Sequence, residues 1–230
     1  MTEDLDALLV SMQLADSAFP SGFYTLSHGL EGYAQAHAID AAHLSVLLED
    51  LLRHSVGPAG GTALAIAHRG ASSGRWDEVS AVDRRLYATM LNREMRMAST
   101  RTGRQLLDVA RKSFGGKGVE RLSVLVAESG SPATQPVAAG VVYADAGAPL
   151  AAAVASELFA FASSFAGAAV RLRLSDHIRA QRLLRDVAPV IAQVARQALA
   201  RPLAELGACT PLADVMSGRH ERADARLFAS

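Results

Sequence analysis

The sequence predicts a single all-α domain of roughly eight to ten helices, and three observations support this prediction. The 230-residue chain is 50% hydrophobic, which is enough for one substantial core. Alanine and leucine dominate, and clusters of β-branched residues are rare, so helices are favoured over strands. The third observation is a leucine stripe with the i, i+3, i+4, i+7, i+8 spacing of one helix face, formed by Leu44, Leu47, Leu48, Leu51 and Leu52.

The first elements follow from apolar spacing and from residues that start or stop helices. Apolar residues from Leu8 to Leu14 predict a short first helix after an acidic start, and a second helix is expected over residues 29–38. Asp40 is expected to be the N-cap of the helix that carries the leucine stripe. The glycine- and proline-rich residues 57–61 are expected to end that helix.

A helix is expected to resume over residues 62–69, and a long charged helix is predicted over residues 77–111. Gly103 lies inside this long helix and is expected to mark a kink or a break. Residues 115–118 contain three glycines and predict a flexible loop. The inward-facing residues of the long helix are expected to be Leu86, Met90, Leu91 and Met97.

The second half is also expected to be mainly helical. Residues 119–128 fit either a strand or a helix, and two prolines open a short helix over residues 132–142. Another proline opens a long helix of small residues that reaches residue 170. The last apolar-periodic segment spans residues 178–199, where Pro189 either kinks the helix or opens a second one.

The chain is expected to divide into an all-α domain over residues 1–206 and an extended C-terminal tail over residues 207–230. After Pro202 the helical pattern fails, yet the chain ends in Arg-Leu-Phe-Ala-Ser. Terminal residues are usually polar and disordered. Because this terminus carries Leu227 and Phe228, the tail is expected to dock on something.

Charge and cysteine content narrow the classes of protein. Lysine plus arginine number 23 and aspartate plus glutamate number 23, so the formal net charge is zero. A nucleic-acid-binding protein usually carries a net basic field, so this class is disfavoured. Cys209 is the sole cysteine, which excludes a disulfide within the chain and fits a reducing cytoplasm. The acidic start is the reverse of a signal peptide.

Residues 150–170 are nearly free of charge and resemble a membrane span in length. They consist mainly of alanine, serine and glycine, which contribute little to insertion, and Glu157 lies among them. A carboxylate at the centre of a bilayer costs roughly 2.5–3.5 kcal/mol on insertion scales. The segment is therefore interpreted as a buried helix of a soluble protein, with no membrane contact.

Sequence motifs for catalysis are largely absent. The chain contains no P-loop, no dinucleotide-binding glycine motif after a strand and no nucleophile elbow. The glycine-rich residues 115–118 lack the spacing and the Ser/Thr of a P-loop. With no catalytic residues assigned and apolar residues in turns, the sequence fits a scaffold or assembly factor better than an enzyme.

A metal site has only weak candidates. None of the seven histidines forms a His-Glu-x-x-His motif, and His37 and His43 do not have helical spacing. Cys209 beside a Thr-Pro pair could supply a thiolate, but a small half-buried loop residue is the better interpretation. His220 is the other weak candidate, and histidines facing each other across a dimer axis stay possible.

Three charged residues allow both a structural and a catalytic interpretation. Glu31 could act as a catalytic acid, but an acid that complements the N-terminal dipole of a helix is favoured. Glu157 in an apolar helix needs a partner, and a structural ion pair with Arg171 or Arg173, from another helix or from a neighbouring copy, is expected. Arg226 could act on a nucleotide in trans, although a terminal arginine is more often solvated.

The most informative stretch is residues 19–31, Phe-Pro-Ser-Gly-Phe-Tyr-Thr-Leu-Ser-His-Gly-Leu-Glu. A connection between helices needs glycine or proline, but it does not need three aromatic residues as well. This aromatic turn therefore either packs on the protein's own core or contacts a partner. Phe23 and Leu30 are expected to pack inward, whereas His28 and Glu31 are better candidates for contact with another protein.

The chain resembles the UreF family of urease accessory proteins in several motifs that occur in the family's order. The family's Leu-Gln-Leu and Pro-x-Gly-x-Phe-x-x-Ser-x-Gly-Leu-Glu pattern corresponds to residues 12–31, where the first triplet reads Met-Gln-Leu, and its Leu-Glu-Asp-Leu-Leu-Arg is present at residues 48–53. Its Pro-Leu-x-x-Leu-Gly appears at residues 202–207. The closing patterns Ser-x-Arg-His-Glu and Arg-Leu-Phe-x-Ser lie at residues 217–221 and 226–230.

The departures from the family pattern are local. Tyr24 stands where Phe is usual, Leu26 replaces Tyr or His, and His28 replaces Gln. These changes leave the packing of the turn intact but alter its polar contacts. Ala229 replaces a common arginine and weakens contact with an acidic partner, and residues 70–135 match only loosely.

The resemblance implies an all-α, non-catalytic homodimer that binds UreD (also called UreH) and the GTPase UreG. That complex delivers nickel to apo-urease with GTP hydrolysis by UreG, so nickel and GTP are handled by the complex and no cofactor is bound stably. The resemblance also implies that binding to UreD orders the tail. The implied partner-binding residues are Tyr24, Ser27, His28, Gly29, Glu31, Ser217, Arg219, His220, Glu221, Arg226, Leu227, Phe228 and Ser230.

Three alternatives stay open. The protein could regulate the UreG GTPase directly through Arg219, Arg222 or Arg226. It could be a helical transcription regulator, against which the zero net charge argues. It could also be a metal-dependent hydrolase that uses His220 and Cys209.

Overall fold

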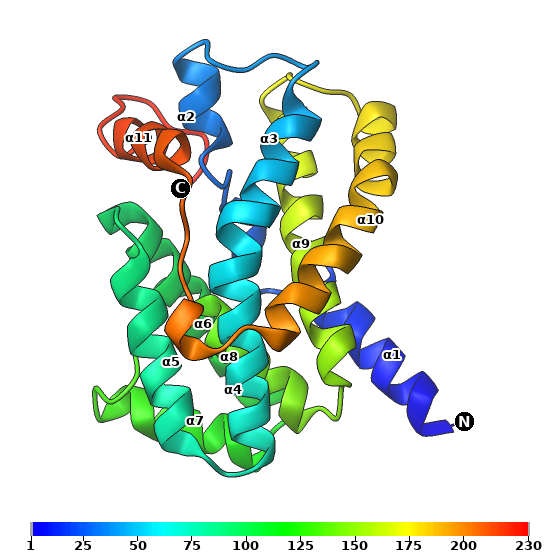
Figure 1. Ribbon diagram of the computed structural model, residues 1–230, viewed down its shortest axis with the longest axis vertical. Coiled ribbons are helices and arrows are strands. Elements are labelled where there is room, and N and C mark those ends of the chain that lie inside the picture. Colours follow the sequence, from blue (N-terminus) through cyan, green and yellow to red (C-terminus); the bar gives the residue numbers. More distant parts are fainter. Residues whose placement is uncertain (1, 230) are drawn as a thin grey trace.

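The computed structural model describes residues 2–229, with side chains from residue 5 onward, and the described residues form helices without a strand. The predicted fold class is confirmed (Figure 1). The N-terminal elements are α1 (Thr2–Ala15), a 3₁₀ turn (Phe23–Thr25), α2 (Leu30–Gln35), α3 (Leu44–Leu51), α4 (Thr62–Ser72), α5 (Trp76–Thr89) and α6 (Arg93–Ser113). The C-terminal elements are α7 (Lys117–Ala127), α8 (Gln135–Asp145), α9 (Leu150–Arg171), α10 (His177–Ala200), a 3₁₀ turn (Leu203–Glu205) and α11 (Pro211–His220).

The core lies between α4, α8 and α9, and the other helices pack around this centre. α4 lies against α8, α9 pairs with α10, and α6 covers another side of α8. Close packing of α4 and α8 depends on Gly140, because a Cβ there would lie 2.6 Å from the Leu64 carbonyl oxygen. Phe165 and Leu158 of α9 are fully buried in the same core, as the apolar composition of α9 predicts.

The prediction that residues 57–61 end the striped helix is wrong. α3 continues into a π-helical stretch (Leu52–Gly61) and then into α4, so the three form one column. The wider π turn accommodates Pro58, which cannot donate a backbone hydrogen bond. A Cβ at Gly57 would lie 2.1 Å from Val194 Cγ1, so this glycine permits contact with α10. With this column counted once, the described residues form ten separate helices, within the predicted number.

The long helix predicted over residues 77–111 is broken, but not at Gly103. The break lies at residues 90–92, between α5 and α6, while Gly103 lies inside α6. A Cβ at Gly103 would lie 2.1 Å from the Ala133 carbonyl oxygen, so the glycine serves close packing. Leu91 lies in the break itself and Met97 lies in the helix that begins after it, and both are exposed instead of inward. The other two residues predicted to face inward are buried or half-buried.

Carboxylates organise several connections. Asp40 accepts hydrogen bonds from the backbone N–H of Ala42 and His43, so it stabilises the turn before α3 and is not the N-cap of that helix. The ambiguous segment 119–128 is helical up to Ala127, and α7 already begins inside the predicted loop. Asp145 accepts from the backbone N–H of Val119 at 2.7 Å and so stabilises the N-terminus of α7.

Two long helices dominate the right side of Figure 1. α10 is a single helix that runs through Pro189. α9 is the one described helix that is long and apolar enough to cross a membrane by length and composition. More than half of it is buried within the domain, which agrees with the interpretation as a core helix.

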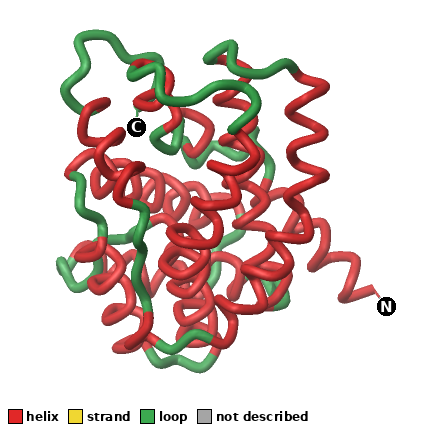
Figure 2. The backbone as a smooth tube through the Cα atoms, turned by 45° about the horizontal axis from the view of Figure 1, so that its top comes forward, coloured by secondary structure: helices red, strands yellow, loops and turns green. Residues whose placement is uncertain are grey.

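The C-terminal tail is not extended throughout, which corrects the sequence prediction. It contains α11, and residues 221–229 then return to the domain beside α2 (Figures 1 and 2). The buried positions of α11 are Met216, Ser217 and His220, two of which are polar, so the helix shows no apolar stripe. A Cβ at Gly32 of α2 would lie 2.4 Å from the Met216 carbonyl oxygen, so the two helices cross closely.

Candidate functional site

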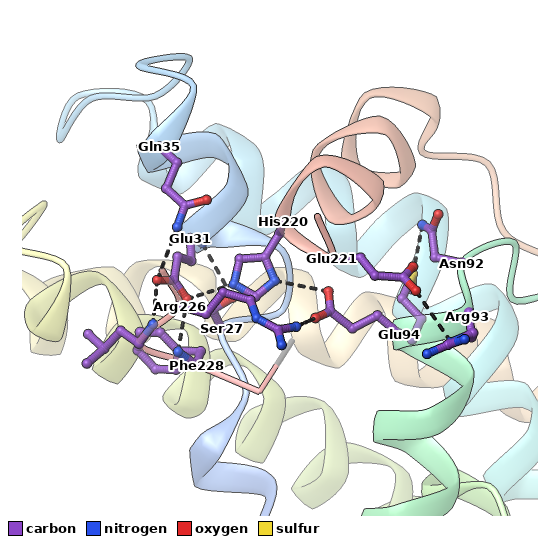
Figure 3. A network of polar contacts seen from close by, with 12 residues as sticks. Ser27, Glu31, Gln35, Asn92, Arg93, Glu94, His220, Glu221, Arg226 and Phe228 are labelled. Atoms are coloured by element: carbon purple, nitrogen blue, oxygen red, sulfur yellow. Dashed lines mark hydrogen bonds and ion pairs between the residues drawn. The ribbon is translucent and has the colours of Figure 1, made fainter. Parts of the chain in front are cut away.

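The candidate site lies where the aromatic turn meets α11 and the last residues of the chain. Its centre is Glu31 in the first turn of α2, which is only 4% exposed. The Glu31 carboxylate accepts hydrogen bonds from the backbone N–H of Leu227 at 2.7 Å and of Phe228 at 2.9 Å (Figure 3). Gln35 Nε2 donates to the Ala225 carbonyl oxygen at 3.0 Å. One turn of α2 therefore holds the C-terminal residues by their backbone.

His220 at the end of α11 connects this carboxylate to a second one. Its Nε2 lies 2.8 Å from Glu31 Oε2, and its Nδ1 lies 3.0 Å from Glu94 Oε2, with the ring fully buried. Arg226 Nη1 lies 2.9 Å from the other oxygen of Glu94. Buried carboxylates need such partners, since an unpaired buried charge is strongly unfavourable. We call Glu31, Glu94, His220 and Arg226 the polar latch.

An arginine of α9 forms a second link between the aromatic turn and the C-terminal tail. The Arg171 guanidinium carbon lies 4.1 Å from the Tyr24 ring centroid and 4.3 Å from that of Phe228. Its Nη2 donates to the Tyr24 carbonyl oxygen at 2.9 Å. The Ala229 N–H also donates to the Thr25 carbonyl oxygen at 3.0 Å. A cation stacked between two aromatic rings thus connects residues from both ends of the chain.

His28 faces the protein's own domain. Its Nε2 lies 2.9 Å from Ser164 Oγ, and its ring lies 4.5 Å from the Phe161 centroid. Burial, together with the charge of Arg171, lowers the pKa of His28 to about 3, so the ring is neutral at physiological pH. Gly29, which follows, has φ of 84° and allows the sharp entry into α2.

The residues expected to bind partners therefore differ in exposure. Tyr24, Arg219, Arg226 and Leu227 are exposed, and Leu227 reaches 65%. His28, Gly29 and Glu221 are intermediate, and Glu221 lies 3.5 Å from the exposed Arg93. Ser230 lies outside the described residues. The remaining residues of the set are buried within this chain, namely Ser27, Glu31, Ser217, His220 and Phe228.

Two residues of the site were not predicted as part of it. Glu94 begins a polar helix, and nothing in its local sequence marks it as a partner of His220. Arg171 was expected to pair with Glu157, but it stacks between Tyr24 and Phe228 instead. Both contacts join segments more than a hundred residues apart, which local spacing does not reveal.

The expected ion pair of Glu157 is not formed among the described residues. Glu157 is 9% exposed and lies between two cavities of about 350 and about 270 Å³. Burial raises its pKa to about 7, although a hydrogen bond from Gln135 opposes the shift. Burial thus favours the protonated form of the Glu157 carboxyl group, which lowers the cost of leaving this group without an arginine partner.

The two weak metal-ligand candidates do not come together with further ligands. Among the described residues, no group of three or more His, Cys, Asp or Glu side chains is arranged to hold a metal ion. Cys209 is exposed, and its backbone N–H donates to the His54 carbonyl oxygen at 2.8 Å. His220 has both ring nitrogens occupied by Glu31 and Glu94.

The fold and the site define a helical protein whose buried polar centre holds its own C-terminus against an aromatic turn. The UreF family model matches residues 39–188. The urease accessory protein UreF of Trichodesmium erythraeum is 31% identical over the full length of both chains. The UreF proteins of Rhodopseudomonas palustris BisA53 and Bradyrhizobium diazoefficiens are 36% and 34% identical, over 97% of this chain and 93% and 92% of theirs. The chain belongs to the UreF family of urease accessory proteins, as the turn and tail motifs predicted.

Proposed function

We propose that this protein is a non-catalytic scaffold in cytoplasmic urease maturation. It joins UreD (UreH) to the GTPase UreG, and the complex inserts nickel into apo-urease with GTP hydrolysis. Family membership supports this role, and so does the absence of a nucleotide-binding motif in the sequence. Nickel is cargo and GTP is the substrate of UreG, so neither needs a resident site in this chain.

The observation that carries the proposal is the joined surface of the turn and the tail. Arg171 brings the exposed Tyr24 ring next to Phe228, and the neighbouring Leu227 side chain is exposed. An exposed leucine beside a fixed aromatic ring, rimmed by Arg226, is typical of a protein contact. We name Tyr24, Arg226 and Leu227 the tail–turn surface and propose that UreD or UreG binds there.

Co-purification with UreD and UreG tests the scaffold role, and absence of a complex under every nucleotide condition would contradict it. Leu227→Ser tests the surface, because this exposed side chain adds little to the fold. We expect at least about a tenfold loss of affinity for the partner, the range of interface hot spots. Leu91→Ser, at a leucine that is 70% exposed elsewhere, is the matched control. Deletion of residues 227–230 should weaken UreD binding further while the domain still folds.

The alternative of direct UreG regulation is favoured by one observation. Arg219 and Arg222 are exposed and have no ion-pair partner among the described residues, whereas Arg226 is paired with Glu94. A trans-acting arginine must be free to reach a nucleotide. UreG turnover should therefore fall with Arg219→Ala or Arg222→Ala if this alternative holds. Unchanged turnover with all three arginines replaced singly would remove it.

A further inference from the structure

The ring of His220 lies between two carboxyl groups at the centre of the polar latch (Figure 3). Its Nε2 lies 2.8 Å from a Glu31 oxygen and its Nδ1 lies 3.0 Å from a Glu94 oxygen. A neutral imidazole has one N–H donor and one acceptor nitrogen, whereas an imidazolium has two donors. An ionised carboxylate can only accept. The number of protons on the ring therefore depends on whether both carboxyl groups are ionised.

Both carboxyl groups have partners that favour the ionised form. The two oxygens of Glu31 accept the backbone N–H groups of Leu227 at 2.7 Å and of Phe228 at 2.9 Å. A protonated carboxyl group would have to give up one of these acceptors. The other oxygen of Glu94 lies 2.9 Å from the Arg226 guanidinium, which is always charged. The ring thus faces an acceptor on each side, and two acceptors require a proton on each ring nitrogen.

The charges of the polar latch balance only when the His220 ring carries both protons. Two carboxylates then face one imidazolium and one guanidinium. α11 packs on α2 and α6, and among the described residues Glu31 and Glu94 are the charged side chains that these helices place against the ring. Beside the latch, Arg93 and Glu221 pair with each other at 3.5 Å and so add no net charge. A neutral ring would leave a buried carboxylate against a nitrogen lone pair, which is unfavourable.

We propose that His220 is a proton-operated switch that controls docking of the C-terminal tail. The tail docks while the ring carries both protons. Loss of one proton to water releases the end of α11 together with residues 221–229. Release exposes Phe228, which is only 5% exposed in the docked tail. Histidine suits this task because a solvated imidazole exchanges its second proton with water at about pH 6.5.

Proton linkage gives the direction and the steepness of the effect. The docked tail holds one proton that a released, solvated His220 loses above about pH 6.5. Docking is therefore most favourable below that pH and weakens as the pH rises. Each unit of pH should raise the ratio of released to docked tail by about tenfold, because each release loses one proton. The switch operates in the free chain and rests on none of the partner contacts proposed above.

Amide hydrogen exchange of the full-length natural chain tests the proposal without any partner. The backbone N–H groups of Leu227 and Phe228 are bonded to Glu31 only in the docked tail, so their protection gives the ratio of released to docked tail. After correction for the intrinsic pH dependence of exchange, this ratio should rise by about tenfold per unit from about pH 7 to about pH 9. A ratio that does not change over this range would overturn the proposal.

Nitrogen chemical shifts of the His220 ring provide a second measurement on the same natural chain. They should show that both ring nitrogens are protonated at about pH 7 while the tail is docked. A neutral ring in a docked tail would overturn the proposal.

Glu94→Gln separates a titrating ring from a purely structural one. The glutamine amide can donate to an unprotonated Nδ1 and still accept from Arg226, so a neutral ring satisfies every partner. The released-to-docked ratio of this variant should therefore stay within about twofold from about pH 7 to about pH 9. Glu221→Gln removes a charge next to the same histidine and is the matched control, which should keep the tenfold dependence. A tenfold dependence that persists in Glu94→Gln would overturn the proposal.

Glu157 is a second group that titrates in this range, because burial raises its pKa to about 7. Its loss of a proton could weaken the whole domain and release the tail indirectly. The dependence should therefore persist in Glu157→Gln, which cannot titrate. Loss of the dependence in this variant would assign the proton to the core and overturn the proposal.

Discussion

Glu31 and His220 lie 189 positions apart in the sequence, yet their side chains meet at 2.8 Å in the buried centre of the polar latch. The same carboxylate accepts the backbone N–H groups of Leu227 and Phe228. One side chain therefore fixes both the end of α11 and the last residues of the chain. Backbone N–H groups are the same in every segment, so these two bonds alone would hold any C-terminal sequence. The side chains of His220 and Arg226 make the polar latch specific for this tail.

Glu31→Gln should release the C-terminal residues while the helical domain stays folded. The amide has one acceptor oxygen where the carboxylate has two, so it cannot accept from His220 and from both backbone N–H groups as the carboxylate does. Leaving buried donors without their acceptor costs roughly 1–3 kcal/mol per group, unless the tail undocks and water replaces the acceptor. Amide hydrogen exchange should show lost protection over residues 221–229 and in α11.

Glu49→Gln is the control for that experiment. Glu49 forms a surface ion pair with Arg53 at 3.7 Å, and exposed pairs contribute about 0–1 kcal/mol. Its exchange pattern should match that of the natural chain. Unchanged protection of residues 221–229 in Glu31→Gln would show that the carboxylate does not hold the tail.

Arg171→Lys should uncouple the turn from the tail although the charge is kept. A lysine ammonium cannot stack its plane between two rings or donate with the geometry of a guanidinium. We expect a loss of roughly 1–2 kcal/mol in tail docking, the range for a partly desolvated cation–π contact. Fluorescence of a label on residue 227 should report greater mobility. Arg173→Lys, at a neighbouring exposed arginine, should leave that mobility unchanged.

The sequence was sufficient for the fold class and for the family. Apolar periodicity located most helices, and the prolines before α8 and α9 marked their starts. Prediction from the sequence failed where a glycine permits close packing instead of forming a turn, as at Gly57 and Gly103. The effect of such a glycine depends on which residue of a distant helix lies against it.

The site was predicted only in part for the same reason. Motifs identified the turn and the tail, but the residues that connect them, Glu94 and Arg171, lie in helices without a distinctive pattern. Glu31 and His220 were expected on a partner-facing surface and are buried within the chain. A motif identifies a residue that belongs to the family pattern, but it does not show whether that residue contacts its own chain or a partner.

Gly57→Ala should destabilise the domain through overpacking. The added methyl would lie 2.1 Å from Val194 Cγ1 and 2.7 Å from the Leu52 carbonyl oxygen, so α10 would have to move. Overpacked cores typically lose about 1–3 kcal/mol. Gly167→Ala in α9 is the control, because nothing lies within 4 Å of its added Cβ and alanine favours the helix. In chemical unfolding, the free energy of unfolding of the natural chain should lie above that of Gly57→Ala and below that of Gly167→Ala.

Glu157→Gln should change how stability depends on pH. The pKa of Glu157 is about 7 in the folded protein against an ordinary 4.5, so the folded state binds the proton more tightly. This contribution is fully present below pH 4.5 and is lost as pH rises through 7, a difference of about 3 kcal/mol. Glutamine resembles the protonated acid at every pH. The two proteins should therefore unfold at similar urea concentrations at pH 4.5, while the variant is more stable at pH 8.

The low pKa of His28 acts in the opposite direction below pH 6.5, but it is common to both proteins and cancels in the comparison. A constant difference between the two proteins from pH 4.5 to 8 would show that Glu157 does not hold its proton in the folded state.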